Sequence, residues 1–173
     1  MKGGLFIRNS SKNMVRCALF AALIAVCSWI SVPVSDIAFT LQTFGIFLTL
    51  GLLGGKRGSA AVLIYLLLGA AGMPVFSGFR GGIGVLAGVT GGYLWGFLLA
   101  GLTYRALERF GKLPAMIAGQ VACYLCGCFW FYLYAGGGLA LIIGRCVLPY
   151  LIPDAVKIAL AYILTRRLQR HLT

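Results

Sequence analysis

The sequence VLPYLIPDAVKIALAYILT, residues 147–165, decides the fold class of this chain. About 20 mainly apolar residues span the hydrocarbon core of a bilayer, and the only formal charges in this stretch are Asp154 and Lys157. A charge inside a membrane span costs roughly 3 kcal/mol on the lowest scales, so by default it marks a functional site. The two residues have opposite signs and lie on one helix face, next to Pro153, which bends or starts a helix. A purely structural ion pair is the alternative.

The remainder of the chain is equally apolar. Of its 173 residues, 61% are hydrophobic and 10% are charged, with a mean hydropathy of +0.97, whereas a soluble domain carries about 25% charged residues. We therefore expect an all-α integral membrane protein in which residues 1–173 form a single membrane-embedded substrate-binding domain. Residues 1–13 form a basic cytoplasmic segment. The apolar run after them lacks a convincing small-residue cleavage site, so we expect it to be retained as the first span.

Six apolar segments are expected to cross the membrane: residues 14–31, 39–53, 59–72, 91–107, 113–134 and 146–168. Twelve of the 15 lysines and arginines lie at or near four places: the start of the first segment, the connection between the second and third, the connection between the fourth and fifth, and the end of the sixth. Because basic residues accumulate on the cytoplasmic side, this pattern predicts six transmembrane helices with cytoplasmic N- and C-termini. Topology then explains the net charge of +12 without nucleic acid as a partner.

The connection at residues 73–90, MPVFSGFRGGIGVLAGVT, is expected on the outer side. It is rich in glycine and also apolar, unlike the flexible polar linker that is its alternative, and glycine lets a backbone approach a ligand closely. We expect this Gly-rich loop to fold over the outer mouth of the bundle. Asp154 lies twelve residues, or about 18 Å, before Arg166. That places it in the outer half of the membrane, where a small ligand entering from outside could reach it.

Several aromatic residues lie near the outer ends of the expected spans. Tyr93 follows a glycine pair at the start of the fourth segment. Its ring and hydroxyl suit ligand binding, although an interfacial aromatic residue is an equal alternative. Trp29 and Trp130 are better explained as interfacial belt residues.

The first segment carries small residues at a spacing of four: Ala18, Ala21, Ala22 and Ala25. Such a face lets helices approach closely, either within the bundle or against a partner protein. The residues alone favour neither possibility.

Catalytic chemistry has little support in the sequence. The chain has three acidic residues and one histidine, with no nucleophile–base set, and LGGKRGS at residues 53–59 lacks the spacing of a phosphate loop. Cys123, Cys126 and Cys128 fit small packing residues better than a metal site, because no second ligand pair is nearby. We expect neither enzyme activity nor a metal, and no ATP use by this chain. Energy for active transport would come from another chain or from a gradient.

Seven stretches, in order along the chain, carry a family resemblance. They are FTLQT at 39–43, LLGGK at 52–56, YLLLG at 65–69, GMPVFSG at 72–78, GGIGVL at 81–86, TGGYLWGF at 90–97 and PDAVK at 153–157. Together they resemble BioY, the biotin-specific S component of energy-coupling factor (ECF) vitamin transporters. The resemblance covers nearly the whole chain.

The resemblance implies a six-helix bundle that binds biotin near its outer face, with ligand contacts at Tyr93, Asp154 and Lys157. In this assignment the Asp accepts from the ureido N–H groups and the Lys pairs with the valerate carboxylate. Phe76 adds an apolar contact, and Gln42 lies in the first matching stretch. Arg80 could instead meet the carboxylate.

Two positions depart from the family pattern. Val89 stands where proline is frequent, and Phe79–Arg80 stands where small or amide residues are expected. A polar contact from this part of the loop to the ligand is therefore in question.

The resemblance also implies partners. A transmembrane T component would dock on the alanine face of the first helix, and two ATPase subunits would use the ATP, while this chain binds no cofactor. Biotin and membrane lipid complete the expected partners, in a bacterial plasma membrane. The alternatives are an S component for another vitamin, or a structural or regulatory membrane subunit that binds no solute.

Overall fold

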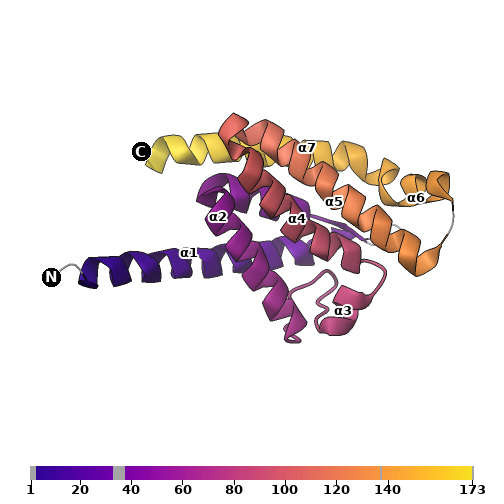
Figure 1. The fold of residues 1–173 in the computed structure, drawn as a ribbon, viewed down its shortest axis with the longest axis horizontal. Coiled ribbons are helices and arrows are strands. Elements are labelled where there is room, and N and C mark those ends of the chain that lie inside the picture. Colours follow the sequence, from indigo (N-terminus) through magenta and orange to yellow (C-terminus); the bar gives the residue numbers. More distant parts are fainter. Residues whose placement is uncertain (1–2, 33–37, 137, 173) are drawn as a thin grey trace.

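The computed structural model describes residues 3–32, 38–136 and 138–172. Its elements are mainly helical (Figure 1). In chain order they are α1 (Gly3–Trp29), β1 (Ser31–Val32), β2 (Phe39–Thr40), α2 (Gln42–Ala70), α3 (Ile83–Ala87), α4 (Gly91–Leu107), the 3-10 helix η1 (Glu108–Phe110), α5 (Lys112–Ala135), α6 (Leu139–Cys146) and α7 (Leu148–Leu172).

Within the described residues, four helices are long and apolar enough to cross a membrane: Ser11–Trp29, Gln42–Ala70, Lys112–Ala135 and Leu148–Arg170. Helix α4, with 17 residues, lies at the lower limit of about 17–25 residues for a span. Large apolar side chains on these helices face outward, for example Leu125 at 67% and Ile152 at 76% exposure. Lipid accommodates such side chains, so the surface as well as the helix lengths fits a membrane protein.

Helix α2 is a hairpin of two helical arms. Gly54 has φ 77° and ψ 165°, which is not helical. Gln42 Nε2 donates to Tyr65 Oη at 2.7 Å, although 23 residues of straight helix would separate them by about 34 Å. A Cβ at Gly58 would lie 2.8 Å from the Leu50 Cα. The chain therefore reverses at Gly54, and the predicted segments 39–53 and 59–72 correspond to the two arms, about 18 and 24 Å long.

Helices α4 and α5 approach closely through glycine. A Cβ at Gly96 would lie 3.0 Å from the Cys123 Sγ, and one at Gly119 would lie 3.0 Å from the Ala100 carbonyl oxygen. This contact belongs to one buried cluster that also contains side chains of α1, α2 and α7. Gly92 also faces α5, because a Cβ there would clash with the Trp130 side chain.

The basic segments meet at one end of the bundle. Glu108 Oε2, after α4, accepts from the Gly55 N–H at 2.8 Å. Lys112 Nζ, at the start of α5, donates to the Gly51 carbonyl at 3.3 Å and also to Gln169 Oε1 of α7. Both chain termini lie toward this end, whereas α3, α6 and the strands lie toward the other (Figure 1).

Three local details go beyond the predictions. The chain is not wholly α-helical, because Ser31 pairs with Thr40 and Val32 with Phe39 in a short antiparallel ladder. Two connections contain helices, α3 and α6, since helical hydrogen bonds satisfy the backbone groups of these apolar segments. Of the two effects expected of Pro153, a bend or a helix start, the start is excluded, because α7 begins at Leu148 and continues through the proline.

Candidate ligand-binding site

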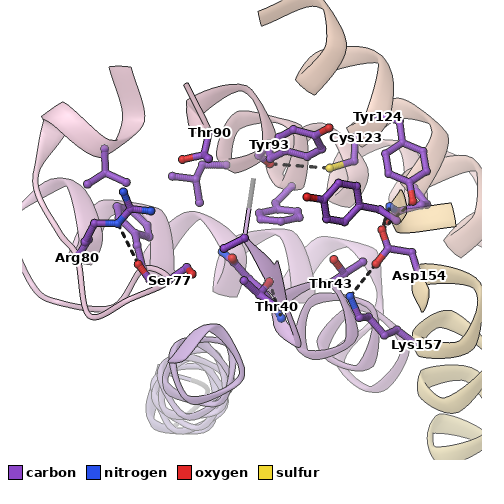
Figure 2. Close-up of a pocket in the computed structure, with 18 residues that line it drawn as sticks. Thr40, Thr43, Ser77, Arg80, Thr90, Tyr93, Cys123, Tyr124, Asp154 and Lys157 are labelled. Atoms are coloured by element: carbon purple, nitrogen blue, oxygen red, sulfur yellow. Dashed lines mark hydrogen bonds and ion pairs between the residues drawn. The ribbon is translucent and has the colours of Figure 1, made fainter. Parts of the chain in front are cut away.

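One cavity collects every side chain predicted to bind ligand. The space among its lining side chains is about 690 Å³ when the open mouth is counted. The predicted residues that line it are Gln42, Phe76, Arg80, Tyr93, Asp154 and Lys157. They come from α2, the 73–90 loop, α4 and α7, so residues 115 positions apart in sequence share one space. Figure 2 shows Arg80 on the opposite side of the cavity from Asp154 and Lys157.

Asp154 has three hydrogen-bond donors around it. Its Oδ1 lies 2.9 Å from Lys157 Nζ. Its Oδ2 accepts from Gln120 Nε2 at 2.8 Å and from Tyr124 Oη at 2.7 Å. Asp154 and Lys157 are each only 5% exposed, and charges at such depth are tolerated when they are paired and hydrogen-bonded. We call Gln120, Tyr124, Asp154 and Lys157 the helical wall of the cavity.

Lys157 has an aromatic neighbour besides the Asp154 carboxylate. Its Nζ lies 4.0 Å from the centre of the Phe39 ring, within the range of cation–π attraction. Phe39 in turn stacks on Tyr150 with ring centres 6.3 Å apart. Asp154 and Lys157 therefore face each other, as the structural alternative expects, while both also line the cavity.

Tyr93 has its hydroxyl engaged within the protein. The Oη donates to the Cys146 carbonyl at 2.6 Å, which connects α4 to the last residue of α6. The ring lies over Gly127 of α5, where a Cβ would come within 2.7 Å of it. The ring lines the cavity, so Tyr93 offers a ligand an aromatic surface rather than a free hydroxyl.

Residues 73–90 form the loop wall of the cavity. Phe76 is 1% exposed and meets Tyr65 edge to face at 5.5 Å. Its backbone N–H donates to the Arg80 carbonyl at 2.9 Å. The Arg80 side chain is exposed, with its Nε donating to the Ser77 carbonyl at 3.1 Å. Within the described part of the chain it has no carboxylate partner, so it is available to an anion.

Two tryptophans attach the loop wall to the helices. Trp29 Nε1 donates to the Pro74 carbonyl at 2.8 Å, and its ring stacks on Phe79 with centres 5.1 Å apart. Trp130 Nε1 donates to the Gly88 carbonyl at 3.0 Å. The interpretation of both as interfacial belt residues therefore misses their contacts, because an indole N–H near a loop finds a carbonyl as readily as a lipid headgroup.

The alanines of α1 occupy two different faces. Ala21 and Ala25 are 1% and 5% exposed and belong to the main buried cluster, so they cannot present a docking surface. Ala18 and Ala22 are exposed. The prediction that all four meet a partner is wrong for the buried pair, because residues 21 and 25 turn toward α2 when residues 18 and 22 turn outward.

Cysteine contributes packing in this region. Cys123 is 1% exposed, and its Sγ contacts the Tyr93 carbonyl at 3.8 Å. Among the described residues, no three His, Cys, Asp or Glu side chains lie close enough to share a metal ion.

Gln120 and Tyr124 were not predicted from the sequence. They are four residues apart on α5, hence on one helix face, and they point to Asp154 from a segment that is otherwise apolar. An amide buried in an apolar span is a functional signal in its own right. That criterion would have selected Gln120.

The fold and cavity together define a multi-pass helical membrane protein with a small-molecule site. Comparison with known proteins then identifies its family. The chain matches the BioY family over residues 4–173, and it belongs to that family, as the resemblance of its motifs implied.

Individual relatives agree with this assignment. The chain is 39% identical to the biotin transporter BioY of Thermotoga maritima over 165 residues, which are 92% of this chain and 96% of that protein. It is 42% identical to a probable biotin transporter BioY of Pyrococcus horikoshii over 161 residues, 92% of this chain and 97% of that protein. These names describe transporters rather than enzymes.

A solved structure shares the fold. The S-component for biotin from an ECF-type ABC transporter matches with a TM-score of 0.86 and 24% identity, over 98% of this chain and 95% of that one. At this identity the match supports the architecture alone.

Proposed function

We propose that this chain is the biotin-binding subunit of a vitamin uptake system. One observation carries the proposal: a single cavity has a buried polar wall at one side, an aromatic middle, and an exposed cation at the other side. Biotin has the same sequence of groups, since its ureido ring donates N–H bonds, its bicyclic body is apolar and its valerate is an anion. The names of the chain's relatives point to the same ligand.

The geometry favours one orientation of biotin. Lys157 Nζ is 2.9 Å from Asp154, whereas the ureido and carboxylate groups lie at opposite ends of biotin. One molecule therefore cannot give its ureido group to Asp154 and its carboxylate to Lys157. We place the ureido ring at the helical wall, the bicyclic body between Tyr93 and Phe76, and the carboxylate toward Arg80.

The membrane topology that accompanies this function has six crossings: α1, the two arms of α2, α4, α5 and α7. Both termini are then cytoplasmic, and the basic end of the bundle faces the cytoplasm in accord with the positive-inside rule. The 73–90 loop covers the outer mouth of the cavity, and residues 1–173 act as one substrate-binding domain.

The energy for uptake comes from partners in this proposal. A T component docks on the exposed α1 face that contains Ala18 and Ala22, where small residues permit close helix contact. Two ATPase subunits use the ATP, and this chain binds only biotin and lipid.

A binding screen tests the function directly. The purified chain in detergent is titrated with biotin, thiamine and riboflavin by isothermal calorimetry, and we expect saturable binding of biotin alone. Preference for another vitamin would keep the transport role and replace the substrate. If no vitamin binds, the result would favour a structural subunit in which Asp154 and Lys157 form only an internal ion pair.

A further inference from the structure

Gln120 is the helical-wall residue whose polar side chain is only half satisfied. It lines the cavity and is 6% exposed. Its Nε2 donates to Asp154, but its Oε1 is buried without a partner. Among the described residues, three more buried polar atoms lack partners, all hydroxyls of side chains outside the cavity lining: Ser59 Oγ, Tyr104 Oη and Thr165 Oγ1. A hydroxyl can rotate toward a partner, whereas this amide oxygen cannot, and an unpaired buried acceptor needs an explanation.

The direction of the Gln120 amide is fixed by its neighbour. An ionised carboxylate only accepts hydrogen bonds, so the NH₂ end of Gln120 must face Asp154 and the oxygen must face away. Lys157 already donates to Asp154 Oδ1 at 2.9 Å, and Tyr124 donates to Oδ2 at 2.7 Å. The helical wall thus holds a carboxylate with donors at both oxygens beside one acceptor with none.

We propose that Gln120 Oε1 accepts a hydrogen bond from one ureido N–H of biotin, and that Asp154 positions this amide. The inference rests on the proposed function, because it takes biotin as the occupant. Burying Gln120 Oε1 is unfavourable unless a ligand N–H donates to it. The helical wall therefore favours ligands with a hydrogen-bond donor at this position over ligands with an acceptor there. Gln120 is then a residue that determines specificity, and Asp154 acts partly through it.

Two biotin analogues test this contact. Each is a cyclic carbamate in which one ureido N–H is replaced by oxygen, so that size is nearly unchanged. Both are titrated by calorimetry against the full-length wild type and Gln120→Met. In the wild type we expect one carbamate to bind at least about tenfold more weakly than biotin, because its oxygen opposes Gln120 Oε1. In Gln120→Met we expect biotin to weaken by about tenfold and the difference between biotin and that carbamate to disappear.

Tyr124→Phe is the matched control. It also removes one donor to Asp154 but leaves Gln120 Oε1 in place, so it should retain the wild-type discrimination between the ligands. Gln120→Asn, which is too short to bridge Asp154 and the ligand, serves if Gln120→Met does not fold, and it should likewise lose the discrimination.

The outcomes separate the two proposals. A Gln120 variant that discriminates as the wild type does, or a wild type that binds both carbamates as tightly as biotin, overturns the contact and leaves biotin binding intact. A wild type that does not bind biotin overturns the function itself.

Discussion

The two walls of the cavity hold their polar groups in opposite ways. The helical wall buries Asp154 and Lys157 at 5% exposure each and surrounds the carboxylate with three donors. The loop wall carries Arg80 at the surface and is attached to the helices by two indole N–H groups. Buried charges need ion-pair and hydrogen-bond partners as soon as the chain folds. An exposed cation is solvated by water and needs no such partner until an anionic ligand binds. The helical wall is therefore part of the folded framework, and the loop wall leaves its cation accessible to a ligand.

The largest effect should follow from breaking the helical wall. Asp154→Asn leaves Lys157 as a buried unpaired cation, and Lys157→Met leaves the carboxylate unpaired. Each should lower the free energy of unfolding by about 3–5 kcal/mol and greatly weaken biotin binding. Thermal unfolding in detergent and calorimetry measure the two quantities.

The double variant distinguishes pairing from binding. Asp154→Asn with Lys157→Met removes both charges, so it should recover much of the lost stability without recovering biotin binding. Single variants as stable as the wild type would mean that the pair is not part of the folded framework.

A smaller effect should follow from loosening the loop wall. Trp29→Phe and Trp130→Phe keep an aromatic ring and remove the N–H bonds to Pro74 and Gly88. Each hydrogen bond is worth about 1 kcal/mol, so each variant should weaken biotin by about fivefold, mainly by faster dissociation, because the loop must be ordered when the ligand is bound. Stopped-flow fluorescence measures the rates.

Trp95→Phe is the matched control for that prediction. Trp95 lies on α4, is 42% exposed and is not among the residues that line the cavity, so its substitution should leave dissociation unchanged. Equal rates in all three variants would show that the indole contacts do not hold the loop wall.

The difference between the walls also explains what the sequence could predict. Asp154 and Lys157 stand out because charges are rare in an apolar span, and the two arms of α2 follow from the basic Lys56–Arg57 turn between apolar runs. The composition of residues 73–90 predicts that they lie over the cavity, but it does not predict which residues attach the loop wall to the helices. A bond from Trp29 to the Pro74 carbonyl joins residues 45 positions apart, and no local pattern specifies it.

The sequence also could not predict which partner each site residue contacts or whether that residue is buried. Spacing puts Asp154 and Lys157 on one face, yet whether they pair with each other or with a ligand depends on which donors α5 brings to them. Likewise, spacing groups Ala18 with Ala22 and Ala21 with Ala25, but only the packing of α1 against α2 decides which pair is buried.

The smallest effect should come from substitution of Arg80, which tests whether the exposed cation of the loop wall contacts the ligand. An exposed ion pair contributes about 0.2–1 kcal/mol, so Arg80→Gln should weaken biotin by at most about fivefold and leave folding unchanged. The loss should shrink at high salt, because an exposed pair is screened. It should also be absent for biotin amide, which has no carboxylate. Lys56→Gln removes an equally exposed charge at the other end of the bundle and should have no effect on either ligand. If Arg80→Gln instead weakens the binding of biotin and of its amide equally, the biotin carboxylate does not contact Arg80. Arg80 then stabilises the loop rather than binding the ligand.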